Sequence, residues 1–163
     1  MSGAPYIAIV GPSEAEEPVL GLAFECGRML AAGGAVVVCG GLGGVMDAAC
    51  RGVHESGGMT VGLLPGFDRS AANPHLTVAI ATGLGELRNG LVVRAADAVI
   101  GVGGSFGTLS ELALARRIGT PVVLLGGWRV HEASGASAEL GVRVRTAPRA
   151  VAVALAAARA RAS

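Results

Sequence analysis

The feature that most constrains this fold is a repeated succession of a short apolar segment, a glycine-rich turn and a helical stretch. The apolar segments include Tyr6–Val10, Ala35–Cys39 and Ala98–Val102, and each is followed directly by glycine. They are apolar throughout rather than alternating, which is typical of parallel strands covered by helices on both faces. The sequence therefore predicts an α/β fold, a Rossmann-like doubly wound parallel sheet formed by residues 1–163 as a single domain.

Glycine and proline residues also mark the ends of the remaining predicted strands and helices. Further strands are predicted at Thr60–Leu64, Leu76–Ile80 and Val122–Leu125. Helices are predicted at Pro18–Gly33, Val45–Ser56, Glu86–Ala96 and Leu109–Ile118, and from Pro148 onward. The segments Phe67–His75 and Gly126–Leu140 are expected to be loops. Because parallel strands end at one edge of their sheet, the loops that begin at Gly11, Gly40 and Gly103 are expected to meet there, where such sheets bind ligands.

Charge and residue usage exclude several classes of function. All 13 basic residues are arginines, so Schiff-base chemistry and a phosphate-binding P-loop lysine are excluded. The net charge of +1 and the lack of a basic stripe argue against a nucleic-acid polymer as partner. No apolar run reaches the roughly 18 residues that a membrane helix needs. The three cysteines form no CxxC pair and lie in apolar stretches, as buried thiols do. We therefore expect a cytoplasmic protein without a membrane partner.

The glycine-rich loop that follows the apolar segment Ala98–Val102 favours a small anion as its ligand. Residues Gly103–Thr108 lie between a buried strand and a helix, so backbone N–H groups and the helix N-terminus converge there. Glycines allow a phosphate to approach the backbone closely. The alternative is a purely structural turn, in which Thr108 and Glu111 form a capping box for the helix.

The Gly40–Gly44 loop does not match a dinucleotide-binding fingerprint. It reads GGLGG rather than GxGxxG, and no acidic residue ends a strand about 20 residues later. Its glycines are expected either to let the base or sugar of a ligand pack closely or to form a plain strand-to-helix turn. A nicotinamide cofactor is therefore not expected, and no other cofactor is predicted. The histidines, His54, His75 and His131, show no metal-ligand spacing, so no metal is predicted.

Two motifs and the spacer between them resemble the Lonely Guy (LOG) family of lysine decarboxylase-like Rossmann proteins. Arg88-Asn89 is similar to that family's Arg-Lys helix start, and Gly103–Glu111 (GGSFGTLSE) is similar to its PGGxGTxxE signature. Arg88 and Glu111 are 23 positions apart (111 − 88), which fits the family's spacing. Residues 40–46 and 61–65 are also similar to family segments, so the resemblance covers nearly the whole chain. Within the family, the chain looks most similar to a short bacterial branch that also includes molybdenum cofactor carrier proteins.

The resemblance implies an N-glycosidase that hydrolyses nucleoside 5′-monophosphates, such as AMP-like or cytokinin nucleotides, to free base and ribose 5-phosphate. In that reaction Glu111 would stabilise the cationic sugar or activate water, and Arg88 would hold the substrate. The implied phosphate-binding residues are Gly104, Ser105, Gly107 and Thr108. The implied base- and sugar-binding residues are Gly40, Gly41, Gly43, Gly44 and Met46. The resemblance also implies a homodimer, and the apolar helix surface Ala150–Ala158 is compatible with one.

Three departures from the family signatures leave a second hypothesis open. Gly103 stands in place of proline, Ser105 in place of a glycine, and Asn89 in place of lysine. A nucleotide or molybdenum cofactor (pterin phosphate) carrier would use the same loops without turnover. Simpler structural roles also remain for the two key residues, with Arg88 as a solvated helix-start residue and Glu111 as a helix cap.

Overall fold

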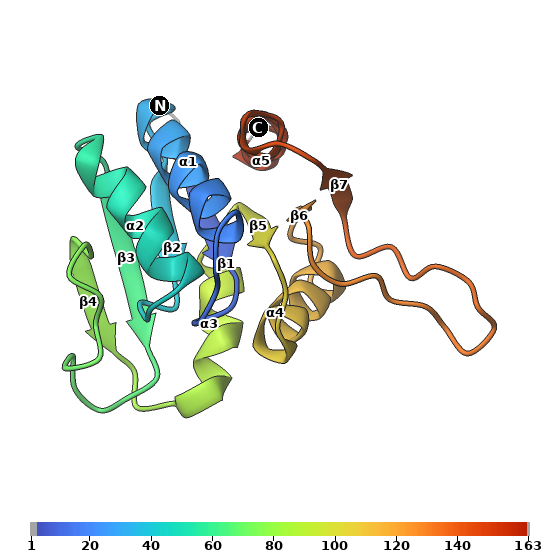
Figure 1. The fold of residues 1–163 in the computed structure, drawn as a ribbon, viewed down its shortest axis with the longest axis horizontal. Coiled ribbons are helices and arrows are strands. Elements are labelled where there is room, and N and C mark those ends of the chain that lie inside the picture. Colours follow the sequence, from blue (N-terminus) through green and yellow to red (C-terminus); the bar gives the residue numbers. More distant parts are fainter. Residues whose placement is uncertain (1–2, 163) are drawn as a thin grey trace.

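The computed structural model describes residues 3–162, whose seven strands form one sheet between two layers of helices (Figure 1). The strands are β1 (Tyr6–Val10), β2 (Val36–Cys39), β3 (Met59–Leu64), β4 (Val78–Ala81), β5 (Ala98–Val102), β6 (Val122–Leu125) and β7 (Val142–Val144). The helices are α1 (Val19–Ala32), α2 (Val45–Glu55), α3 (Asn89–Arg94), α4 (Phe106–Arg117) and α5 (Ala147–Ala162), with a 3₁₀ turn η1 (Gly85–Arg88) before α3.

The sheet has the order β4-β3-β2-β1-β5-β6-β7, and all neighbouring strands are parallel. The chain runs outward from β1 to β4, crosses back to β5 on the other side of β1, and continues outward to β7. This confirms the predicted doubly wound α/β fold. The reversal of direction places the carboxyl ends of β1 and β5 side by side, and a crevice forms at such a point.

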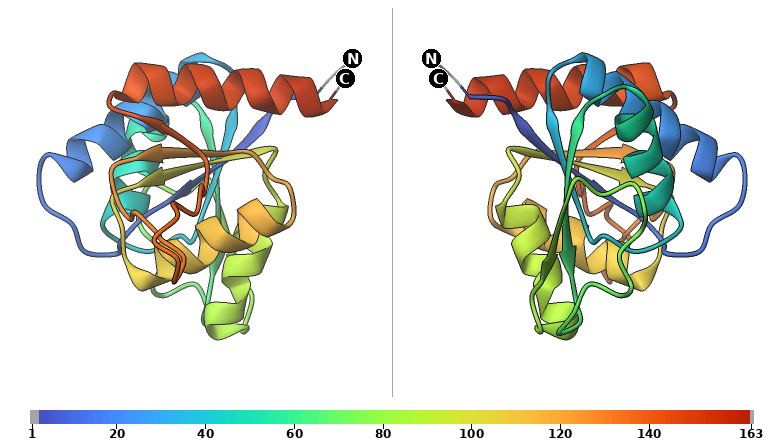
Figure 2. Two further views of the ribbon diagram at one scale, coloured as in Figure 1. Left: turned by 90° about the vertical axis from the view of Figure 1, so that its right-hand side faces the viewer. Right: turned by 90° about the vertical axis from the view of Figure 1, so that its left-hand side faces the viewer.

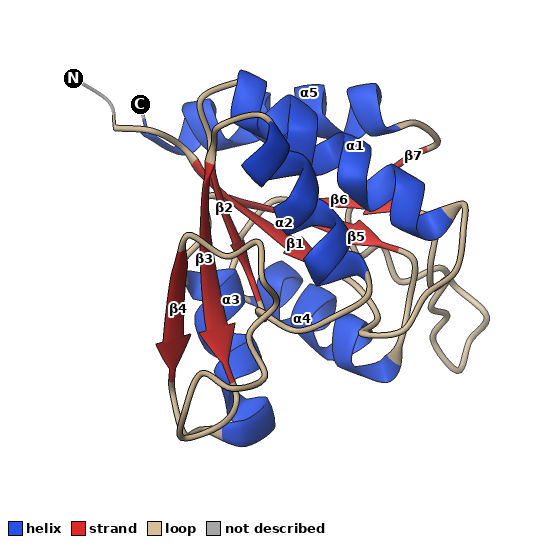
Figure 3. Ribbon diagram, turned by 60° about the vertical axis from the view of Figure 1, so that its left-hand side comes forward, coloured by secondary structure: helices blue, strands red, loops and turns tan. Residues whose placement is uncertain are grey.

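Helices cover both faces of the sheet, with α1, α2 and α5 on one side and α3 and α4 on the other (Figures 2 and 3). Strand β1 shows why its sequence is apolar throughout. Ile7 and Ile9 pack into the core beneath α1, α2 and α5, whereas Ala8 and Val10 pack into the core beneath α3 and α4. Because successive side chains of a strand point to opposite faces, both faces must be apolar when both are covered.

Two predicted helices have different boundaries in the structure. The expected helix Glu86–Ala96 is divided into η1 and α3, and η1 begins at Gly85 with φ +55°. The helix expected at Leu109 begins at Phe106, because Ser105 caps it: the Ser105 Oγ accepts a hydrogen bond from the Thr108 N–H at 3.2 Å. The predicted capping box of Thr108 and Glu111 is therefore wrong, since the residue that caps the helix is Ser105, three positions before Thr108.

The ends of the sheet and the last helix also differ from expectation. Strand β7 was not predicted, because three residues are too few to show a periodic pattern of apolar side chains. It forms by pairing with β6. Strand β4 lies at Val78–Ala81 rather than Leu76–Ile80, since its register is set by β3. Ala150, Ala154 and Ala158 of α5 are buried in the core, so this apolar face packs internally. Within residues 3–162, no helix is long and apolar enough to cross a membrane.

Candidate functional site

A cavity of about 410 Å³ opens at the carboxyl ends of the central strands. Its wall combines residues from the loops that follow β1, β2 and β3 with residues of η1 and the first turns of α4. Of the residues singled out by sequence, the structure brings together here Gly40, Met46, Arg88, Ser105, Gly107, Thr108 and Glu111. Segments far apart in the chain thus meet at the expected edge of the sheet.

Four further predicted residues, Gly41, Gly43, Gly44 and Gly104, are absent from the cavity wall. Their neighbours show what their lack of a side chain permits. A Cβ on Gly104 would lie 2.8 Å from Cδ1 of Trp128, and one on Gly44 would overlap the backbone of Pro12 and Ser13. These two glycines let loops pack against one another behind the wall.

Arg88 is buried, with 7% of its surface exposed, at the end of η1. Its guanidinium lies over Gly40, where an added Cβ would sit 2.5 Å from Nη2. Nη1 donates a hydrogen bond to Oδ1 of Asn89 at 2.5 Å, which helps to hold the guanidinium in place. Within the described residues, the buried Nε has no hydrogen-bond partner. The interpretation of Arg88 as a solvated helix-start residue is therefore wrong.

Glu111 faces Arg88 from the inner side of α4 and is only 6% exposed. Its Oε1 lies 3.6 Å from Nη1 of Arg88, which is an ion-pair distance but too long for a hydrogen bond. Burial raises the pKa of Glu111 to about 7, and the positive charge of Arg88 opposes that rise. Near neutral pH this carboxyl group therefore exists in both protonation states, as groups that transfer protons or bind ligands often do.

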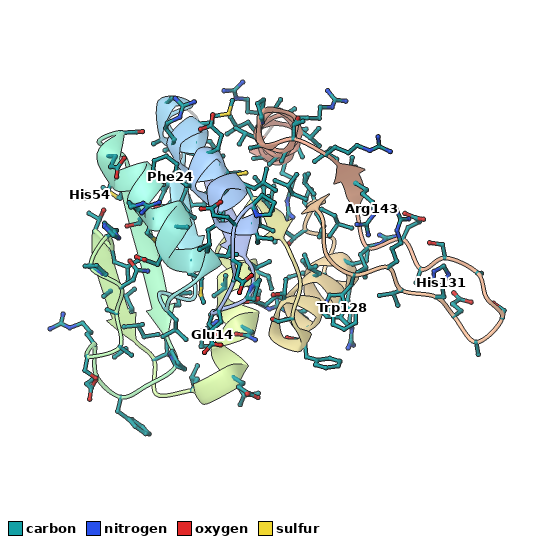
Figure 4. All side chains as sticks on the ribbon, in the orientation of Figure 1. Glu14, Phe24, His54, Trp128, His131 and Arg143 are labelled. Carbon is teal, nitrogen blue, oxygen red and sulfur yellow. The ribbon has the colours of Figure 1, made fainter. Side chains whose placement is uncertain are left out.

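The turn from β5 to α4 contributes Ser105, Gly107 and Thr108 to the cavity that Arg88 also lines. First-turn N–H groups of a helix, here those of Phe106 and Gly107, have no acceptor within the helix and carry its positive dipole end. Trp128 supports the turn from behind, because its Nε1 donates to the carbonyl oxygen of Ser105 at 2.9 Å. Arg143 of β7 in turn donates to the carbonyl oxygen of Trp128 at 2.6 Å, and Figure 4 shows these two side chains near each other.

Sequence reasoning missed Trp128 and Arg143 because they lie far from the motifs they support. It also missed Asn73, whose Nδ2 donates to the carbonyl oxygen of Leu42 at 3.1 Å and so supports the wall. The only signal in the sequence was the Asn-Pro dipeptide at Asn73, which marks a turn, and only the structure shows that this asparagine is buried.

The histidines lie outside the cavity wall. Nδ1 of His75 lies 2.8 Å from Oδ1 of Asp47, a pairing across 28 positions that no local pattern predicts. His54 and His131 lie on opposite sides of the molecule (Figure 4). Among residues 3–162, no three histidine, cysteine, aspartate or glutamate side chains gather in a way that could hold a metal ion. Cys26, Cys39 and Cys50 are buried free thiols, as predicted.

Two solved structures are similar to this chain over nearly its whole length. The chain is 29% identical to the molybdenum cofactor binding protein from the phototrophic bacterium Rippkaea orientalis, with a TM-score of 0.83 over 94% of this chain and 96% of that one. It is 30% identical to the Moco carrier protein from Chlamydomonas reinhardtii, with a TM-score of 0.81 over 97% and 99% of the two chains. The predicted likeness to a branch with molybdenum cofactor carriers is confirmed.

An uncharacterized protein of Archaeoglobus fulgidus is 38% identical over 132 residues, which are 77% of this chain and 87% of that protein. The model of the SLOG cluster4 family matches residues 4–152. The chain therefore belongs to the SLOG cluster4 family.

Proposed function

We propose that this protein binds the phosphate group of a small phosphorylated ligand, and that its ligand is the molybdenum cofactor, which it carries without chemical change. The observation that carries the proposal is Arg88, a buried cation on the cavity wall with an unused Nε donor. A buried charge without full pairing is costly, so a site that keeps one is suited to an anionic ligand.

The phosphate ester of a pterin cofactor matches the two donor groups of the cavity. Arg88 supplies a permanently charged planar group, and the N-terminal turn of α4 supplies N–H groups beside Ser105. The cavity volume of about 410 Å³ is in the usual range for sites that hold small ligands. Asn89 and Ser105, where the LOG signatures have lysine and glycine, favour binding over turnover. The names of the two similar solved structures support the choice of ligand.

Fluorescence of Trp128 tests the proposal, because it is the only tryptophan and contacts Ser105 directly. We expect a saturable change on titration with molybdenum cofactor and, more weakly, with AMP. Arg88→Gln should weaken binding about 10- to 100-fold, as loss of a charged hydrogen-bonding group does. Arg94→Gln, on the exposed surface of α3, is the matched control. Equal affinity of the two variants would refute the proposal.

A second candidate function, nucleoside 5′-monophosphate hydrolysis, is favoured by the facing pair Arg88 and Glu111. Water would add to the sugar carbon as the bond from that carbon to the base nitrogen breaks, and the products would be free base and ribose 5-phosphate. Ionised Glu111 would stabilise the cationic sugar, so the rate should rise with pH as its pKa of about 7 is passed. Incubation with AMP and N6-prenylated AMP, followed by chromatography, decides this. If no free base appears at high protein concentration, only the carrier function remains.

We also propose that the protein is a homodimer through an apolar surface beside the cavity. Phe67 and Leu87 are 92% and 81% exposed, and Leu84 and Leu91 are 45% and 40% exposed. Phe67 packs close to Gly83, so the four side chains belong to neighbouring segments. Large apolar side chains left exposed on neighbouring segments are typical of contact surfaces between proteins. The adjacent residues Gly85, Glu86 and Arg88 line the cavity, which places the surface at its rim.

A further inference from the structure

Arg88 and Glu111 form a buried pair whose charged groups are not joined by a direct hydrogen bond. Both side chains are 8% exposed, and Nη1 and Oε1 are 3.6 Å apart, beyond hydrogen-bond distance. Nε of Arg88 has no partner within the described residues. An anion that enters the cavity at Arg88 therefore meets a carboxyl group that is held only loosely and has little contact with water.

Placing a bound anion and an ionised Glu111 beside the same buried arginine is unfavourable in free energy, because water does not screen the repulsion between the two negative charges there. Protonation of Glu111 removes this repulsion and converts the carboxyl group into a hydrogen-bond donor. We propose that the cavity binds a dianionic group together with one proton, with the anion at Arg88 and the proton on Glu111. This inference rests on the proposed phosphate site, and it assigns Glu111 the role of a neutral donor to the ligand.

The other charged and titratable groups near Glu111 do not take this role. Glu86, on η1, is an exposed residue at the rim of the cavity. Cys39 lies at the end of β2, near enough to feel the charges of both Arg88 and Glu111. A hydrogen bond from Cys50 lowers the pKa of Cys39, but its thiol is fully buried behind the cavity wall. Glu111 is the acidic group that both lines the cavity and faces Arg88.

The proposal makes binding depend on pH in one direction. Below its pKa of about 7, Glu111 already holds the proton that the anion requires. Above that pH, binding must first take up a proton, so the affinity falls. For one linked proton, the dissociation constant should be about tenfold larger at about pH 8 than at about pH 6.

Sulfate is the probe, because it stays a dianion throughout this range whereas phosphate itself titrates. The protein is titrated with sulfate at constant ionic strength, and Trp128 fluorescence is followed at the two pH values. We expect the tenfold weakening in the wild type and none in Glu111→Gln, which should bind at both pH values about as the wild type does at the lower one. Cys39→Ala is the control and should keep the pH dependence.

Calorimetry of the wild type in two buffers of different ionisation enthalpy gives a second readout that needs no variant. Uptake of about half a proton per bound sulfate is expected at about pH 7. Saturable sulfate binding without proton uptake, or with a pH dependence that survives in Glu111→Gln, would overturn the inference while leaving the phosphate site intact. Failure of sulfate, molybdenum cofactor and AMP alike to bind at either pH would instead overturn the proposed function, and this inference with it.

Discussion

Gly40 is a residue whose missing side chain makes room for a functional group. An alanine Cβ at this position would lie 2.5–2.7 Å from three atoms of the Arg88 guanidinium, so that group would have to move. We expect Gly40→Ala to weaken binding of phosphorylated ligands about tenfold, since misplaced charged hydrogen bonds lose most of their strength. Titration monitored by Trp128 fluorescence measures the loss. Gly43→Ala, whose Cβ would meet only the Ser13 carbonyl oxygen at 3.2 Å, is the control and should bind nearly normally.

Glu111 links the stability of the folded protein to pH. Its pKa rises from the ordinary value of 4.5 to about 7, so the folded state keeps a proton that the unfolded state has already released. The stabilisation is complete below about pH 4.5 and is lost as pH rises through about 7. From about pH 5 to about pH 8, Glu111→Gln should gain about 2 kcal/mol of unfolding free energy relative to the wild type. Urea unfolding at the two pH values measures this, and a constant difference would show that the carboxyl group is ionised throughout.

At the scale of the element, helix α4 begins where its cap is placed rather than where its apolar periodicity starts. Oγ of Ser105 accepts the Thr108 N–H, and the same residue lines the cavity. Ser105→Ala should therefore destabilise the protein by about 1 kcal/mol and lower the thermal midpoint by about 2–4 °C.

The matched control for Ser105 lies in the same helix. Ser110 donates to the carbonyl oxygen of Gly107 from an exposed position and does not cap the helix. Calorimetry of Ser110→Ala should show a change within about 0.5 kcal/mol of the wild type. Equal losses in both variants would show that the cap contributes no more than any other surface hydroxyl group.

For the whole molecule, the proposed homodimer predicts that a charge placed in its contact surface halves the mass of the assembly in solution. Leu87→Glu places a charge in the exposed apolar surface of Phe67, Leu84, Leu87 and Leu91, and burying that charge without a partner is unfavourable. Sedimentation should show a dimer for the wild type and a monomer for this variant. Val142→Glu, on β7 at the opposite edge of the sheet, should remain a dimer. A wild-type monomer would refute the homodimer.

The sequence by itself determined the parallel sheet, its two helical layers and the edge that carries the cavity. Uniformly apolar strands such as β1 require cover on both faces, and a glycine directly after the strand marks its end. The local sequence pattern is therefore sufficient to predict these features. The motif around Arg88 and Glu111 was also visible, because residue types and spacing survive in the linear sequence.

Only the tertiary structure decided how these side chains are held. The burial of Arg88 over Gly40, its unused Nε, and the loose pairing with Glu111 depend on distances between three separate segments. The support of Ser105 by Trp128 and Arg143, and the short strand β7, depend in the same way on long-range packing. Local patterns determine which backbone conformation a segment prefers, but desolvation and charge pairing arise only when distant segments meet.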